Sequence, residues 1–129
     1  MPVHRGLGLD NRPAWCDVTS AGIFKVPRDG WFDRHYHDFN EYWLVYKGRA
    51  KVLSEGRDYV VGPGDIVCTR AGDEHDVLEV YEDLEAFWFE EGLEGEGRLG
   101  HLHRAPELAH GHPVPGATEE RRSVGVDGG

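Results

Sequence analysis

Short apolar segments separated by turns that contain glycine or aspartate make up the central part of the chain. No segment shows the helical period in which apolar residues recur three or four positions apart. Many short strands with regular turns are typical of an all-β sandwich or barrel. A turn is expected at Ser20-Ala21-Gly22, and the strands predicted after it are Ile23–Val26, His35–His37, Tyr42–Tyr46, Arg49–Leu53, Asp58–Val61, Asp65–Cys68, His75–Tyr81 and Leu84–Phe89.

The two ends of the chain differ from this central part. Residues 1–22 are predicted to form an N-terminal arm and a first strand, and residues 23–91 the β-barrel. Residues 92–129 are rich in glycine, histidine and proline, which predicts an irregular C-terminal extension. Its last part, from His110 to Gly129, is expected to be disordered.

Three residues of types that commonly bind metals occur at odd-numbered positions within a short stretch of the chain. His35, His37 and Glu41 are two and four residues apart, and side chains at this spacing in a strand point to one face. Two imidazoles and a carboxylate inside a sheet are costly to bury without a partner. A divalent metal ion satisfies all three groups, and His75 supplies a fourth candidate ligand.

These two stretches resemble the sequence motifs of the cupin family. In the first motif a glycine precedes His-x-His, a glutamate follows after three or four residues, and a glycine follows six residues later. The second motif runs glycine, Pro-x-Gly, histidine and asparagine, but here an arginine replaces the proline and a glutamate replaces the asparagine. The matching residues are Gly30, His35, His37, Glu41 and Gly48 in the first motif, and Gly64, Arg70-Ala71-Gly72, His75 and Glu79 in the second.

The resemblance covers about residues 24–90. It implies a small single-domain cupin, in which a double-stranded β-helix (jelly-roll) barrel holds a divalent metal ion. The matched metal ligands are His35, His37, Glu41 and His75. Three histidines and one glutamate leave two positions open on an octahedral ion, which suits iron, manganese, nickel or cobalt, whereas zinc with four protein ligands is more often closed.

Strand parity also predicts the lining of the pocket. Trp43 and Val45 share the parity of the first ligands, and Val77 and Glu79 share that of His75. Glu79 is a candidate general base on the interior face. The alternative is that it forms a salt bridge with an interior arginine or lies at the rim.

Other polar residues near the motifs have two interpretations each. Arg34 adjoins a ligand and could bind a substrate carboxylate or phosphate, although a rim salt bridge is the commoner fate of such a residue. The pairs His101/His103 and His110/His112 lie in glycine- and proline-rich surroundings, which favours a solvated tail that binds metal adventitiously. The alternative is that His101 or His103 lies across the barrel mouth and touches substrate.

In the strand predicted at Tyr42–Tyr46, the residues that face away from the predicted ligands are apolar or aromatic as well. Tyr42, Leu44 and Tyr46 alternate with the inward set, and both faces of Leu84–Phe89 carry large apolar groups. A sheet with two apolar faces must bury both of them. The barrel interior buries one, and we predict that a second subunit buries the other, so that the protein is a homodimer. The alternative cover is the N-terminal arm or the segment from Leu93 to Leu102.

Composition limits the size, location and partners of the protein. The chain has 129 residues, enough for one domain, and its net charge of −10 argues against nucleic acid or an anionic membrane as partner. No apolar run approaches the ~20 residues of a membrane span. The first residues lack the apolar core of a signal peptide, and two cysteines are too few for a disulfide framework, so a cytoplasmic location is expected.

The sequence leaves three functional hypotheses. The first is a metal-dependent enzyme acting on a small oxygenated organic molecule, with dioxygenase chemistry slightly favoured over an isomerase or lyase reaction. The second is a non-catalytic cupin that contains metal and binds or senses a small ligand. The third is a sugar-modifying cupin isomerase, which would need a polar interior.

Overall fold

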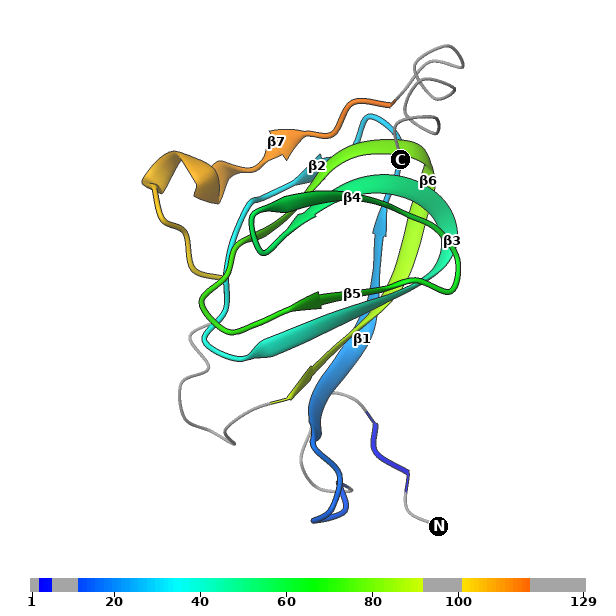
Figure 1. The fold of residues 1–129 in the computed structure, drawn as a ribbon, viewed down its shortest axis with the longest axis vertical. Helices are drawn as coiled ribbons and strands as arrows, with labels where there is room; N and C mark the ends of the chain where they lie inside the picture. The colour runs from blue at the N-terminus through cyan, green and yellow to red at the C-terminus, as the bar shows by residue number, and fades with distance from the viewer. Residues whose placement is uncertain (1–2, 6–11, 92–100, 117–129) are drawn as a thin grey trace.

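The computed structural model describes residues 3–5, 12–91 and 101–116 of the chain. Its strands form one antiparallel sheet in the order β1-β6-β3-β4, with β5 also paired to β3, and a small sheet of β2 and β7 (Figure 1). The all-β prediction is confirmed. The strands are β1 (Val18–Val26), β2 (Trp31–Phe32), β3 (Asn40–Ser54), β4 (Arg57–Val61), β5 (Ile66–Thr69), β6 (His75–Glu91) and β7 (His112–Pro113), and a 3-10 helix spans Pro106–His110.

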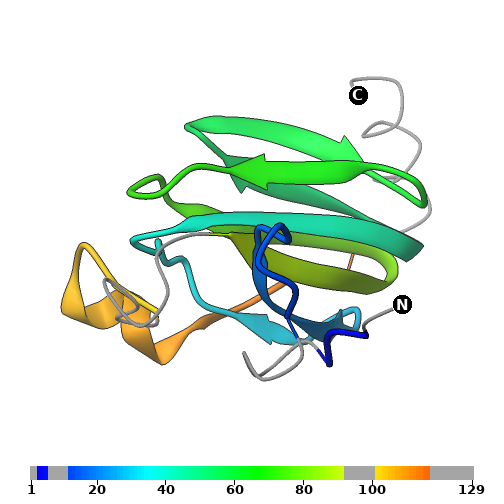
Figure 2. The same ribbon diagram turned by 90° about the horizontal axis from the view of Figure 1, so that it is seen from below.

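Two long strands bend together to form the barrel. β3 and β6 each join two segments that the turn signals had separated, and they pair along almost their whole lengths. Several register shifts interrupt this pairing between Val45 and Ala50. Such irregularities bend and twist a strand, which lets both strands curl over so that the sheet folds back over itself (Figure 2).

Gly48 marks the bend in β3. Its φ of 87° lies in the left-handed region, and a Cβ placed there would meet the carbonyl oxygen of Asp83 at 2.0 Å. The glycine therefore allows the backbones of β3 and β6 to approach at the bend, where the sequence pattern had predicted a turn between two strands.

Gly22 has a different role from the one that the sequence pattern predicts. The turn expected at Ser20-Ala21-Gly22 is wrong, because β1 continues through these residues and pairs with β6. A Cβ on Gly22 would lie 2.7 Å from the ring of Trp88. The glycine makes room for this indole within the sheet.

The segment from His35 to His37 also differs from its prediction. It is not a regular strand but contributes isolated bridges, one from His35 to His75 and one from Tyr36 to Leu102. Both partners lie far away in the sequence, so local propensity could not reveal them.

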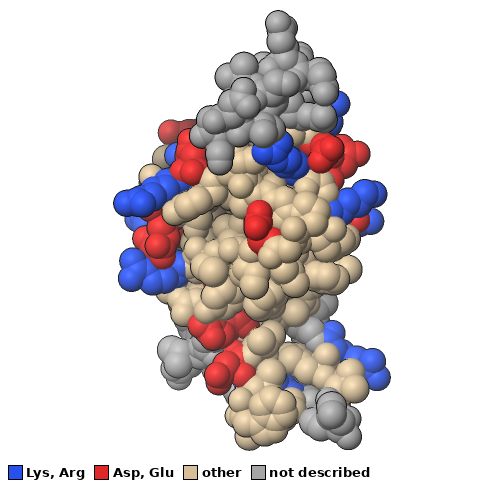
Figure 3. Space-filling view, turned by 45° about the vertical axis from the view of Figure 1, so that its right-hand side comes forward, with Lys and Arg blue, Asp and Glu red and all other residues tan. Residues whose placement is uncertain are grey.

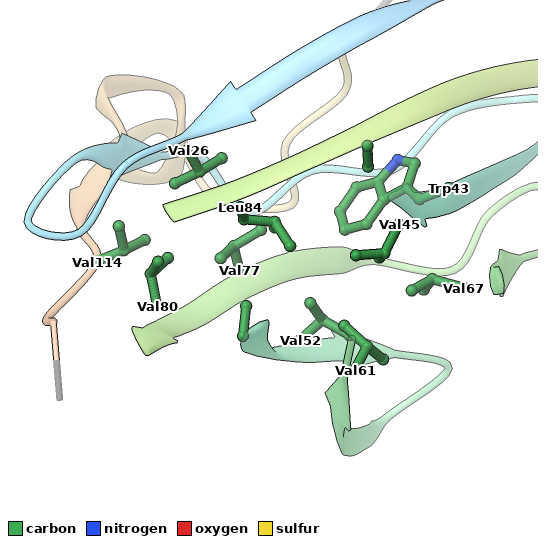
Figure 4. Packing of buried hydrophobic residues seen from close by; sticks show 12 residues of the cluster. Val26, Trp43, Val45, Val52, Val61, Val67, Val77, Val80, Leu84 and Val114 are labelled. Atoms are coloured by element: carbon green, nitrogen blue, oxygen red, sulfur yellow. The ribbon is translucent and has the colours of Figure 1, made fainter. Parts of the chain in front are cut away.

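Valine side chains dominate the interior. Val45, Val52, Val77 and Val80 are fully or almost fully buried in a cluster that fills the barrel (Figure 4). Val114, from the C-terminal segment, is buried in the same cluster. The interior is therefore completed by a residue outside the central strands.

The structure describes the C-terminal segment over residues 101–116. β7 pairs with β2 beside the barrel, and the amide of Val80 donates a hydrogen bond of 3.0 Å to the carbonyl of Pro115 (Figure 1). The disorder predicted from His110 onward is thus wrong for His110–Gly116, because burial of Val114 and these backbone hydrogen bonds hold the segment in place. The remaining part of that prediction, residues 117–129, lies outside the described residues. Within the described ranges, no helix has the length and apolar character needed to cross a membrane.

We expect Gly48→Ala to lower the free energy of unfolding by more than about 2 kcal/mol, since it combines positive-φ strain with a backbone clash. Gly56→Ala is the matched control, because Gly56 also has a positive φ, 75°, but a Cβ there meets nothing within 4 Å. Urea unfolding of both metal-free variants measures the difference. Equal losses would show that the contact with Asp83 is unimportant.

Candidate metal centre

The four predicted ligands come together at one end of the barrel. His35 and His37 precede β3, Glu41 lies in β3, and His75 begins β6. Paired backbone hydrogen bonds join His35 to His75, with N···O distances of 3.2 and 2.8 Å, and fix the two chain segments side by side. One potential ligand atom from each of the four buried residues lies within 4.8 Å of the others.

The imidazoles are oriented so that they could bind one metal ion together. The Nε2 atoms of His35 and His75 lie 2.6 Å apart, and His75 Nε2 lies 3.3 Å from Glu41 Oε1. His35 Nδ1 lies 2.7 Å from the carbonyl oxygen of Asp33, so this nitrogen donates a hydrogen bond and leaves the Nε2 lone pair facing the cluster. Two buried ring nitrogens that face each other so closely need a shared proton or cation between them.

The protonation states of these histidines suit metal binding. Burial lowers the pKa of His75 to about 2 and that of His35 to about 4, and the neighbouring imidazoles contribute in the same direction. Both rings are therefore neutral at pH 7, the form in which histidine ligates metals. Three imidazoles and one carboxylate are a donor set that first-row divalent transition metals accept, so the residues present fit such an ion.

Trp43 supports the fourth ligand. Its indole Nε1 donates a hydrogen bond of 2.9 Å to Glu41 Oε1. A hydrogen bond to a ligating carboxylate fixes its orientation, so Trp43 positions Glu41 in addition to forming the pocket wall that was predicted.

A cavity of about 430 Å³ opens onto the ligand cluster. Aromatic side chains form most of its wall. The polar groups are three of the four predicted ligands and two further residues that strand parity had not assigned to the pocket. The lining residues are Phe24, Phe32, His35, His37, Phe39, Glu41, Trp43, Trp88, Glu90 and His101.

Glu90 is a buried carboxylate in this cavity that the sequence analysis missed. It is the Cα partner of Glu41 across the β3–β6 pair, and directly opposed residues in a sheet point to the same face. The signal was present in the sequence, because Ala86, Trp88 and Glu90 continue one parity. That face could be recognised as the interior only once the pairing of β6 with β3 was known.

Glu79 lies on the opposite face from the ligands, so the parity prediction that it faces the interior is wrong. Leu78 is skipped in the pairing of β6 with β3, and this irregularity reverses the parity after Val77. Glu79 instead lies 3.8 Å from the ammonium of Lys51 and accepts a hydrogen bond of 3.0 Å from the hydroxyl of Tyr81. It is absent from the cavity wall.

The other predicted pocket residues also lie away from the cavity. Val45 and Val77 are buried in the apolar cluster and are not among the lining residues. Arg34 donates a hydrogen bond of 3.1 Å from Nε to the buried carboxylate of Asp76, so the rim salt bridge is the interpretation that the structure supports.

His101 reaches the cavity from the C-terminal segment. Its ring stacks on that of His35 at a centroid distance of 3.8 Å and an interplanar angle of 7°. His103 lies 2.7 Å from Asp33, measured from Nε2 to Oδ2. The interpretation of this pair as a solvated tail is therefore wrong, and the alternative, in which His101 lies at the barrel mouth, matches its position.

The fold agrees with the family to which the sequence of this chain is matched. A family model described as a cupin domain matches residues 22–90, more than half of the chain, and the protein therefore belongs to the cupin family. The chain is 42% identical over 101 residues to the protein y4oW of Sinorhizobium fredii, an alignment that covers 67% of this chain and 47% of the relative. It thus spans about half the length of that curated relative.

Solved structures show the same fold. The DMSP lyase DddQ from Ruegeria pomeroyi aligns with a TM-score of 0.61 and 25% identity, over 71% of this chain and 46% of the lyase chain. A predicted oxalate decarboxylase from Thermotoga maritima aligns with a TM-score of 0.54 and 22% identity, over 60% of this chain and 69% of the other.

We expect His75→Ala to lower metal content and thermal stability together. An ion that binds only the folded state stabilises it by about 3 kcal/mol at a hundredfold excess over Kd, and loss of a ligand reduces this contribution. Elemental analysis and thermal melts with and without a chelator measure both effects.

His4→Ala is the control for this experiment, because His4 lies beside β1 in a different hollow from the ligand cluster. This hollow lies on the outer face of the sheet and is lined also by Ile23 and Phe87, so His4→Ala should leave metal content unchanged. Full metal content in His75→Ala would show that the four-residue centre is wrong.

Proposed function

We propose that this protein is a metal-dependent cupin lyase, which removes a proton from a small oxygenated organic molecule and eliminates a leaving group from the adjacent carbon. Glu90 is the observation that carries the proposal. It places a second carboxylate, outside the predicted ligand set, in the cavity beside Glu41. A buried carboxylate held next to an electrophilic centre is suited to accept a proton from carbon.

The shape and lining of the cavity support a substrate with two different ends. Aromatic side chains form the apolar walls, whereas the carboxylates and imidazoles occur at the ligand cluster. A volume of about 430 Å³ suits a small molecule. We infer a substrate with an apolar body and a carboxylate or carbonyl group that faces the ligands.

The proposed reaction divides its tasks among the residues of this site. A divalent ion held by His35, His37, Glu41 and His75 would supply Lewis-acid polarisation of the substrate oxygen, which acidifies the neighbouring C–H bond. Glu90 accepts that proton, the C–H electron pair becomes the new carbon–carbon double bond, and the leaving group departs from the β-carbon with its bonding electrons. Glu90 then returns the proton to the leaving group or to water.

The similarity to a DMSP lyase, at 25% identity and a TM-score of 0.61, supports the reaction class without identifying the substrate. The aromatic walls argue against the sugar-modifying isomerase, which would need a polar interior. Manganese, iron, nickel, cobalt and zinc all accept this donor set, and we propose one of them as the native ion.

A dioxygenase is the second candidate function. The same apolar cavity would admit dioxygen beside a substrate, and four protein ligands leave positions for both on a six-coordinate ion. This candidate predicts oxygen consumption that depends on substrate, which the elimination does not require.

We expect Glu90→Gln to reduce turnover by about 10²- to 10⁴-fold, the usual contribution of a general base, while metal content stays unchanged. The assay is the appearance of unsaturated product by NMR, with the metal-loaded protein and a panel of small carboxylic acids that carry a leaving group on the β-carbon. Parallel reactions under air and under nitrogen include an oxygen electrode.

Glu79→Gln is the matched control, because Glu79 undergoes the same change of charge on the opposite face of the sheet, and it should retain full turnover. Unchanged turnover in Glu90→Gln would contradict its role as the base. Oxygen uptake that depends on substrate would favour the dioxygenase, and no turnover with any compound would favour a binding module.

We also propose that the protein assembles as a homodimer through the outer face of the sheet. Ile23, Phe87, Leu44 and Ile66 are paired in register, so they form one apolar row across β1, β6, β3 and β5. Ile23, Phe87 and Ile66 are 55%, 42% and 54% exposed, and a monomer rarely leaves so continuous an apolar row in water.

Figure 3 shows a broad region of uncharged residues with an acidic group near its centre, and the other Lys, Arg, Asp and Glu side chains lie toward the margins. A central apolar area with a polar rim is typical of an interface between subunits. A second copy of this chain offers a surface of the same kind, as a twofold dimer requires.

We expect light scattering after gel filtration to give twice the chain mass of 14.5 kDa for the wild type. Phe87→Glu should give the monomer mass, because it places a charge in the centre of the apolar row. Trp31→Glu is the control, since Trp31 is more exposed than Phe87, at 66%, but belongs to β2 in the other sheet. A monomeric wild type would contradict the proposal.

A further inference from the structure

A second group of metal-binding side chains surrounds the carboxylate of Asp33, beside the four-residue centre. Asp33 Oδ2 lies 2.7 Å from His103 Nε2, 3.5 Å from His101 Nδ1 and 3.5 Å from His35 Nδ1. His101 also lines the cavity of the four-residue centre, but Asp33 lies outside the wall of that cavity. One oxygen thus has three ring nitrogens near it.

The C-terminal segment brings two of these imidazoles to Asp33. Leu102 forms a backbone bridge with Tyr36 through two hydrogen bonds of 2.9 Å. His101 and His103 flank Leu102, and residues two apart in an extended segment point to the same side. The guanidinium of Arg104, the residue after His103, lies 4.5 Å from the centroid of the Tyr36 ring. This cation–π contact helps to hold the segment against Tyr36.

His35 belongs to the first centre and not to this group. Its Nδ1 donates to the carbonyl of Asp33 at 2.7 Å, so that nitrogen has no lone pair to offer a second ion. Asp33, His35 and His101 have ligand atoms within 4.8 Å of one another, and without His35 two of these donors remain. His103, 2.7 Å from Asp33 Oδ2, is the third donor. This donor set is distinct from the four-residue centre, although the rings of His101 and His35 stack on each other.

These three residues face a hollow on the outside of the barrel mouth. The wall of this hollow contains Asp33, His101 and His103 together with a further histidine, His110, at the end of the 3-10 helix. The Asp33 and His103 side chains are 23% and 18% exposed, so they are reachable from solvent and partly shielded from it. The hollow would admit a hydrated ion.

We propose that Asp33, His101 and His103 form a second binding site, for a divalent transition-metal ion of the zinc class. Two imidazoles, one carboxylate and a water molecule complete a tetrahedral set. Bonds of about 2.0 Å place tetrahedral ligands roughly 3.3 Å apart. The observed separations of 2.7 and 3.5 Å from Asp33 Oδ2 lie on either side of that spacing. The site closes when the imidazoles of His101 and His103 rotate toward each other.

Nitrogen donors make the site selective. Magnesium and calcium prefer oxygen ligands, whereas imidazole suits zinc, copper and nickel. A bound ion would join the residue after β2 to the C-terminal segment and hold His101 against the cavity wall. Binding of an ion at the second site would therefore fix the position of residues 101–103. This inference does not depend on the proposed lyase activity.

Zinc titration of the untagged full chain, stripped of metal by a chelator, tests the proposal. Calorimetry should show two zinc equivalents for the wild type. Asp33→Asn and His103→Ala should each weaken the second equivalent by about tenfold or more, while His75→Ala should weaken the other one. In the metal-free protein, Asn keeps an oxygen that accepts the hydrogen bond from His103 Nε2. His103 must release that Nε2 proton to bind an ion, so Asp33→Asn separates metal binding from the local fold.

His4→Ala is the control for the number of histidines and should bind two equivalents. Thermal melts of the metal-free proteins should show that Asp33→Asn folds like the wild type. A single equivalent in the wild type would overturn the proposal. Two equivalents that persist unchanged in both Asp33→Asn and His103→Ala would also overturn it, since the second ion would then be adventitious only.

Discussion

The backbone bridge between His35 and His75 is the contact on which the candidate centre depends. It joins the segment before β3 to the start of β6, and it brings their Nε2 atoms to 2.6 Å. Buried neutral imidazoles at this distance are unfavourable without a shared proton or cation. The sheet must therefore hold them together against that tendency, and the long β3–β6 pair supplies the rigidity that does so.

The same pair of strands determines which groups surround the centre. Because Glu41 and Glu90 are opposed in register, one interior face carries both carboxylates, and Trp43 and Trp88 are opposed in the same way. Polar groups at one end of an otherwise aromatic cavity can orient a substrate without making the whole interior polar. A chemical centre thus fits into a barrel whose remaining interior is filled mainly by valine.

Parity predicted the interior correctly only as far as each strand stayed regular. It placed Trp43 on the face of the ligands, but failed for Glu79 because one extra residue in β6 reverses every side chain that follows. The turn signal at Gly48 was real as a local conformation, yet it marks a bend within one strand. A glycine with positive φ is compatible with a turn between two strands and with a bend inside one strand. Only the pairing with β6 shows that Gly48 lies in a bend.

The sequence by itself determined the all-β class, the cupin motifs and the four residues that converge as candidate ligands, because their spacing and residue types are local properties. Tertiary structure alone decided that Glu90 lines the cavity, that Glu79 does not, and that His101 and His103 meet Asp33. These outcomes depend on register and on the return of the C-terminal segment to Tyr36. Such contacts join residues distant in the chain. The local pattern shows that Ala86, Trp88 and Glu90 share a face, but it cannot show which strand that face meets.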